Sequence, residues 1–180
     1  MAVSDVQLIQ AWQRVLELSK LQAGQTVTLL TSDTTNQQTL RCAQTAAQLM
    51  GAITTQVNLS PVNADKALSR DPLAYLGTTP LTGNKVAYAA LSESDLVLDL
   101  MTLLFSPEQQ QILSNGTKIL LAVEPPEILV RTVPTLEDKA RVEAAAEKIR
   151  QAKEMSVVSA AGTDIRLPIG VFPALLEYGF

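Results

Sequence analysis

The chain has 180 residues, 47% of them hydrophobic, and a formal net charge of −4, so it can bury one substantial core. It has no basic cluster for a phosphate backbone and no apolar run long enough for a membrane span, which argues against nucleic acid and membrane as partners. It has no histidine and a single cysteine, Cys42 in an Ala-rich stretch, which excludes a Ser-His-Asp site and any metal site that uses imidazole.

Helical and strand-like segments alternate along most of the chain. Amphipathic stretches that follow Ser or Asn predict helices, and short β-branched or apolar runs predict strands. In chain order we expect a helix from Ser4 to about Lys20, a strand at 26–31, a helix after the polar cluster 32–36 to about Met50, a strand at 53–59, a helix at 84–91, a strand at 95–100, a helix at 106–114 and a strand at 118–123. Several Pro and Gly residues punctuate the stretch 60–82, where we expect no long regular element.

Strands separated by helices indicate an α/β fold with a doubly wound, mostly parallel, Rossmann-like sheet of four or five strands. A long helix that opens at Thr135 and a strand at 156–159 follow, whereas the segment 163–170 is typical of a strand in a different sheet. The apolar ending suggests a truncated chain. We therefore expect a Rossmann-like domain at residues 1–159 and the beginning of an incomplete second domain at 160–180.

No glycine-rich nucleotide-binding motif occurs in the sequence, which favours a scaffold without a dinucleotide or P-loop site. Ligands of parallel α/β sheets bind outside the carboxyl ends of the strands, so Ser32–Thr34, Leu104–Ser106 and Glu124 are expected to face any cleft. Helix capping would also explain the first two loops, and a surface turn would explain Glu124. Glu177 has apolar neighbours, and burial there would suit an acid, a base or a hydrogen-bond partner.

Three stretches resemble the N-terminal half of 2,5-dihydroxypyridine 5,6-dioxygenases: Leu103–Gln109 (LLFSPEQ), Lys118–Glu127 (KILLAVEPPE) and Glu177–Gly179 (EYG). The resemblance covers nearly all of the chain, and members of that family are about twice as long. The family belongs to the same structural group as the aminopeptidase T metallopeptidases. The second domain of those peptidases opens with a run that Gly162–Ile165 resembles.

The resemblance implies an extradiol-type dioxygenase that converts 2,5-dihydroxypyridine and O₂ to N-formylmaleamic acid. Its Fe(2+) would be held by two His and one Asp of the C-terminal half, so this chain would supply no metal ligand and would be inactive alone. Leu104 and Phe105 would contact the substrate, and Glu177 would be the catalytic polar group beside it. Some relatives carry His where this sequence has Phe105, and this chain lacks that proton-handling group.

The expected partners are thus a small aromatic N-heterocycle and O₂, and the expected form is a homo-oligomer. The N-terminus has no basic segment followed by an apolar one, so we expect a cytoplasmic protein. Two alternatives remain open. An aminopeptidase T-like metallopeptidase domain predicts peptide hydrolysis with a divalent metal, and a non-enzymatic α/β binding module predicts a gene that ends near Phe180.

Overall fold

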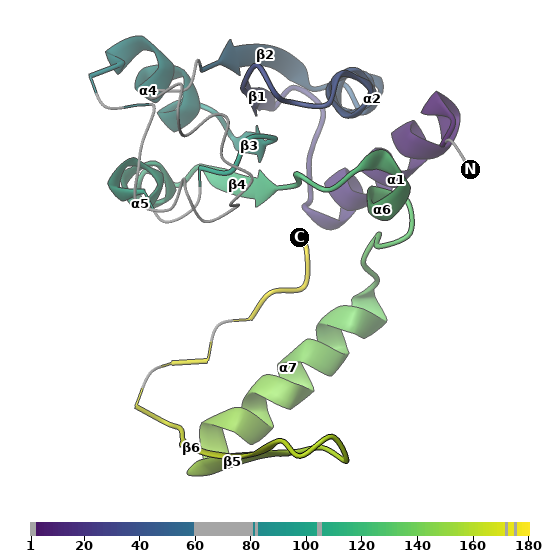
Figure 1. Cartoon of the computed structure of the whole chain (residues 1–180). Helices are drawn as coiled ribbons and strands as arrows, with labels where there is room; N and C mark the ends of the chain where they lie inside the picture. The colour runs from purple at the N-terminus through teal and green to yellow at the C-terminus, as the bar shows by residue number, and fades with distance from the viewer. Residues whose placement is uncertain (1–2, 60–80, 82, 104–105, 172, 175) are drawn as a thin grey trace. The chain divides into compact units, whose positions relative to one another are not determined.

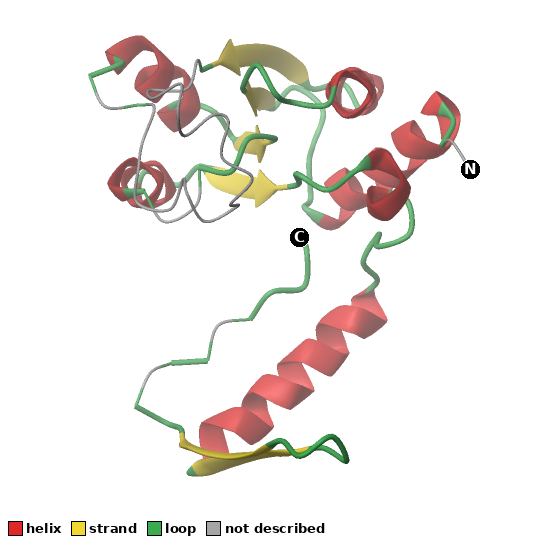
Figure 2. Cartoon of the chain, in the orientation of Figure 1, coloured by secondary structure: helices red, strands yellow, loops and turns green. Residues whose placement is uncertain are grey.

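The computed structural model describes residues 3–59, 81, 83–103, 106–171, 173–174 and 176–180. The chain divides into two compact units, Met1–Val133 and Pro134–Phe180, each with its own sheet. The first unit contains the parallel sheet, and the second contains a long helix and an antiparallel hairpin (Figures 1 and 2). Within the described ranges, no helix is both long enough and apolar enough to cross a bilayer.

The first unit is built on four parallel strands in the order β2-β1-β3-β4. Their bounds are β1 Thr26–Thr31, β2 Ile53–Asn58, β3 Leu96–Asp99 and β4 Lys118–Leu121. In the register, Leu29 of β1 lies opposite Gln56 on one side and Leu98 of β3 on the other. The expected α/β class with a mostly parallel sheet is therefore confirmed.

Helices cover both faces of this sheet (Figure 1). They are α1 Asp5–Leu18, α2 Gln37–Leu49, α4 Lys85–Ser92, α5 Pro107–Ser114 and the short α6 Pro126–Leu129. Four of these helices have a polar N-cap residue whose side chain accepts an N–H of the first turn. The N-cap residues are Ser4, Asn36, Asn84 and Ser106. The short helix α6 is not among the helices that the sequence predicts. Pro126 occupies its first helical position, where the fixed φ of proline permits a helical turn.

Two hydrophobic clusters form the core, one on each face of the sheet. Successive strand residues point to opposite faces, so Leu29 and Leu98 join the cluster under α1 and α2, whereas Leu30 and Val97 join the cluster under α4 and α5. Cys42 is buried in the first cluster, as expected for a free thiol in an Ala-rich helix. The three layers thus follow from strand alternation and helix amphipathicity.

The strand β4, the clearest strand in the sequence, is less buried than its apolar residues suggest. Leu121 is 37% exposed, while every residue of β3 is buried. The reason is position, because β4 is an edge strand of the described sheet and pairs only with β3. Apolar composition predicts a strand but does not say which strand lies in the centre.

The second unit consists of α7 Leu136–Gln151, β5 Glu154–Val158 and β6 Asp164–Pro168, followed by an extended segment. The two strands are antiparallel, and Gly162 closes their turn at φ +97°, where a side chain would be strained. The expectation that the strand at 156–159 belongs to the first domain's sheet is wrong, because it pairs with β6. The boundary expected after residue 159 stays a prediction for the domains of a longer protein, whereas the structure divides after Val133.

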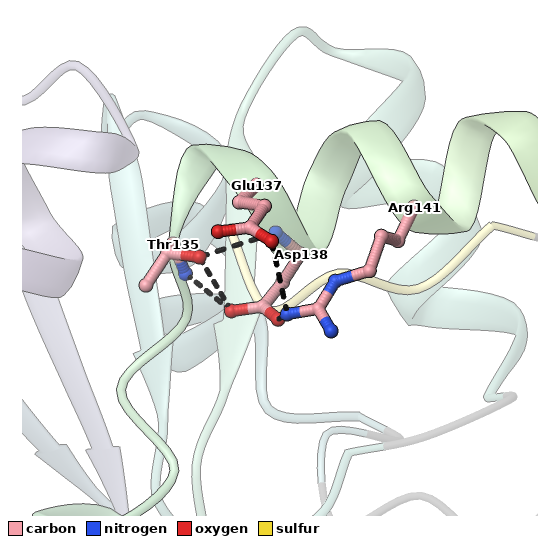
Figure 3. Close-up of polar contacts among 4 residues, drawn as sticks. All are labelled: Thr135, Glu137, Asp138 and Arg141. Carbon is pink, nitrogen blue, oxygen red and sulfur yellow. Dashed lines mark hydrogen bonds and ion pairs between the residues drawn. The ribbon is translucent and has the colours of Figure 1, made fainter.

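The helix α7 begins with a reciprocal capping box (Figure 3). The Thr135 hydroxyl oxygen accepts the Asp138 N–H at 3.1 Å, and the Asp138 carboxylate accepts the Thr135 N–H at 2.9 Å and its hydroxyl at 2.7 Å. Arg141 donates to the other carboxylate oxygen at 2.7 Å. These contacts, led by the Thr135 hydroxyl, lower the pKa of Asp138 below its usual value.

Because the folded-state pKa of Asp138 is lowered, its contribution to helix stability is present above the unfolded pKa of about 3.9 and is lost as pH falls through the folded pKa. We expect Asp138→Asn to speed amide hydrogen exchange in the first turn of α7 at pH 6. Wild type and variant should converge in strong acid. Glu143→Gln, farther along the same helix, should leave first-turn exchange unchanged, and equal protection of wild type and Asp138→Asn at pH 6 would contradict the prediction.

Candidate functional site

The order of the strands places a topological switch point between β1 and β3. From β1 the chain moves to β2 on one side, and it then returns past β1 to β3 on the other side. The loops that leave the carboxyl ends of β1 and β3 therefore diverge, and ligands of open α/β sheets bind in the crevice that such loops form. The candidate site of the first unit is this edge of the sheet.

The loop after β1 supplies hydroxyl and carboxylate groups to the edge. Ser32 N–H donates to the Thr35 hydroxyl at 2.9 Å, and that hydroxyl donates to the carbonyl oxygen of Leu100 at 3.1 Å. Thr35 thereby connects the β1 loop to the β3 loop. Asp33 is exposed and accepts the side-chain amide of Asn58 at the end of β2, at 3.0 Å. Since the N-cap of α2 is Asn36, capping does not account for Ser32–Thr34.

The loop after β3 is organised by a residue that the sequence analysis did not single out. Asp99 is fully buried, and its carboxylate accepts the N–H groups of Met101, Thr102 and Leu103 at 3.0, 2.9 and 2.6 Å. Burial raises the pKa of Asp99, and these three hydrogen bonds oppose that rise. The sequence feature that could have identified Asp99 is an acidic residue at the end of an otherwise apolar strand.

The predicted substrate contacts Leu104 and Phe105 lie outside the described residues. Ser106, which follows them, is buried and caps α5 by accepting the N–H of Gln109 at 3.0 Å, so the capping interpretation holds for this residue. Glu124 follows β4 and is exposed. The structure therefore places Glu124 at the expected end of the sheet without giving its carboxylate a described function.

Glu177 lies in the extended segment of the second unit. Its side chain is exposed, whereas those of Leu176, Tyr178 and Phe180 are partly buried. Alternate residues of an extended chain face opposite sides, so the apolar neighbours face away from solvent and Glu177 faces toward it. The burial that we considered for Glu177 is therefore not found in this chain.

The neighbours of Glu177 nevertheless fix its backbone. The Tyr178 and Phe180 rings pack edge to face with centroids 5.0 Å apart, and Lys139 Nζ lies 4.8 Å from the Tyr178 centroid. Gly179, at φ +83°, passes so close to Pro134 that a Cβ would lie 3.2 Å from the ring. The segment thus presents an exposed carboxylate on an ordered backbone.

A polar pocket of about 440 Å³ lies at the opposite edge of the sheet, beside the amino ends of the strands. Asp95, one of its lining residues, accepts the N–H and the hydroxyl of Thr26 at 2.7 and 2.8 Å. The Thr26 N–H is the largest influence that lowers the pKa of Asp95. Its carboxylate is thus used to stabilise the strand ends, and the switch-point rule favours the carboxyl edge for a ligand.

Comparison with known proteins places the whole chain in one family. A family model described as 2,5-dihydroxypyridine 5,6-dioxygenase matches residues 7–180. A 2,5-dihydroxypyridine 5,6-dioxygenase of Pseudomonas putida KT2440 is 47% identical over 180 residues, which are 100% of this chain and 51% of that protein. A solved structure of 2,5-dihydroxypyridine dioxygenase from Pseudomonas putida KT2440, 47% identical, matches with a TM-score of 0.91 over 99% of this chain and 52% of that chain.

The chain thus spans about half the length of these relatives. The family match extends from α1 to the end of the described segment and includes both compact units. It therefore does not depend on the few motifs that first suggested the resemblance. This chain belongs to the 2,5-dihydroxypyridine 5,6-dioxygenase family.

Proposed function

We propose that this chain is the N-terminal half of a dioxygenase that converts 2,5-dihydroxypyridine and O₂ to N-formylmaleamic acid. The observation that carries the proposal is the 47% identity, over the full length of the chain, to a protein named for this activity. The open α/β edge between β1 and β3 supports it, because such an edge accommodates a small planar ligand.

The residues of this chain do not fit the iron that the resemblance implies. A two-His-one-carboxylate site needs imidazole, and the sequence has no histidine. In the part of the chain that the structure describes, no group of three metal-binding side chains occurs. We therefore propose that Fe(2+) binds to the complete enzyme through ligands outside this chain.

The proposed contribution of this chain is a wall of the substrate cleft. Leu104 and Phe105 would contact the ring of a small aromatic N-heterocycle, and the Phe105 ring can stack on it but cannot transfer a proton. Glu177 would supply a carboxylate for the substrate's nitrogen or hydroxyl groups, and its exposure leaves that carboxylate accessible. A cytoplasmic location and a homo-oligomeric state stay predictions.

The hairpin of the second unit supports the proposal that a second domain begins in this chain, with β5 placing that beginning before residue 160. Cross-strand neighbours Met155 with Leu167 and Val157 with Ile165 form one apolar face, and each of the four side chains is 42% to 47% exposed. An isolated two-stranded hairpin is marginally stable in water. Further strands of a longer protein would cover this face and complete the sheet.

The activity can be tested by oxygen uptake. A protein of the relatives' length, supplied with Fe(2+), is expected to consume O₂ on addition of 2,5-dihydroxypyridine and to form N-formylmaleamic acid. The 180-residue chain alone should consume none and should retain no stoichiometric iron after gel filtration. Metal-dependent peptide hydrolysis without oxygen uptake would favour a metallopeptidase, and ligand binding without either reaction would favour a binding module.

A further inference from the structure

At the switch-point edge, Asp99 at the carboxyl end of β3 carries a fully buried carboxylate. Its side chain has no exposed surface, and its carboxylate oxygens accept the N–H groups of Met101, Thr102 and Leu103. Burying a carboxylate is costly unless its oxygens are well hydrogen-bonded. If this position only had to fill space in the sheet, an apolar residue would do so at lower cost. A buried carboxylate here is therefore explained by the backbone N–H groups of the turn that it binds.

The turn that Asp99 fixes is strained. Thr102 has φ +73°, in the left-handed region that a β-branched residue rarely adopts. All three N–H groups that follow Leu100 point to one carboxylate, which compensates the strain and keeps the backbone in this conformation. The chain direction after β3 is therefore set by Asp99.

Hydrogen bonds also fix Leu103 and Ser106. Leu103 N–H donates to Asp99 Oδ2 at 2.6 Å, and the Ser106 hydroxyl donates to the Leu103 carbonyl oxygen at 3.5 Å. Ser106 is also the N-cap of α5. The same loop is joined to the β1 loop through the bond from Thr35 to the Leu100 carbonyl oxygen.

We infer that Asp99 is a positioning residue of the ligand cleft, whose carboxylate fixes the turn at residues 101–103 and thereby the backbone at the carboxyl end of β3, where the switch-point rule places a ligand. The inference rests on the proposed function in so far as the ligand at this edge is the substrate. The closure of the turn itself does not depend on that function.

The test compares Asp99→Asn with Thr117→Val. Asn has the same shape as Asp, but one of the two carboxylate oxygens becomes an NH₂ group. That group is a donor and cannot accept a backbone N–H of the turn, so a hydrogen bond is lost. Thr117 is also buried, and its hydroxyl donates to the carbonyl oxygens of Leu91 and Ser92, next to the amino end of β4. Thr117→Val is therefore the matched control, because it also removes buried hydrogen bonds but does so at the opposite edge of the sheet.

In the 180-residue chain, Asp99→Asn is expected to speed amide hydrogen exchange at residues 101–103 by about tenfold or more, with little change in the centre of β3. In the complete enzyme we expect kcat/KM for 2,5-dihydroxypyridine to fall about 10- to 100-fold, mainly through a rise in KM. Thr117→Val should lower the Tm and leave both readouts unchanged.

Equal Tm losses in the two variants, with unchanged exchange at 101–103 and unchanged KM, would overturn the inference. If the wild-type enzyme does not oxidise 2,5-dihydroxypyridine, the proposed function fails and the exchange measurement alone decides on Asp99. If Asp99→Asn does not fold, Thr102→Gly replaces it, because Gly adopts φ +73° without strain but frees the turn. That variant should raise KM several-fold without lowering the Tm, and an unchanged KM would refute the positioning role.

Discussion

Replacing Leu98 with alanine is expected to lower the free energy of unfolding of the first unit by about 3 kcal/mol. Leu98 is 0% exposed in the central strand β3, and its strand neighbours Leu29 and Leu120 face the same cluster. Strands on both sides restrict relaxation around the cavity, so the substitution loses packing as well as transfer free energy. Urea unfolding of the chain measures the change.

The matched control is Leu49→Ala, the same chemical change at a side chain that is 65% exposed at the end of α2. It should change the free energy of unfolding by less than about 0.5 kcal/mol. A loss below about 1 kcal/mol for Leu98→Ala would contradict tight packing around this side chain.

Elements with strong local signals could be predicted almost to the residue. The strand β1 has the expected bounds 26–31, because a β-branched run is bounded by Gly24 and by a polar cluster. The helix α5 begins as expected, because Ser106 and Pro107 form an N-cap and first-position proline. In both cases, the determining contacts lie within a few residues of each other.

Features that depend on long-range pairing could not be predicted in the same way. The sequence of β5 is compatible with either sheet, and only its pairing with β6 shows that it lies in the second one. The edge position of β4 is likewise decided by strand order and not by its apolar composition. Local periodicity determines which residues can face a core but not which strand lies beside which.

The candidate site shows the same division. Chain order and strand ends were enough to nominate the loops after β1 and β3, and that nomination stays a prediction. The hydrogen bonds of Asp99, in contrast, join a strand end to a strained turn that no propensity scale predicts. For Glu177, apolar neighbours suggested burial, yet alternation along an extended segment leaves its side chain exposed. Neighbours in sequence are not neighbours on one face of an extended chain.

In the complete enzyme, Glu177→Gln is expected to lower kcat with 2,5-dihydroxypyridine by about 100-fold or more, the range for loss of a group that transfers or holds a proton. The change preserves shape but removes the charge and the ability to exchange a proton. Because the Glu177 side chain is exposed, the Tm of the 180-residue chain should stay nearly the same. Steady-state oxygen uptake and thermal unfolding measure the two effects separately.

Glu143→Gln is the control for charge, since Glu143 is also exposed in the second unit and pairs only at 4.0 Å with Lys139. Its kcat should equal that of wild type, because a solvated ion pair on a helix surface contributes little to stability or catalysis. A structural role for Glu177 predicts the reverse pattern, with a lower Tm and near-normal kcat in the folded fraction. The exposed carboxylate argues against that pattern, since the backbone at this point is fixed by Tyr178, Gly179 and Phe180 and not by Glu177.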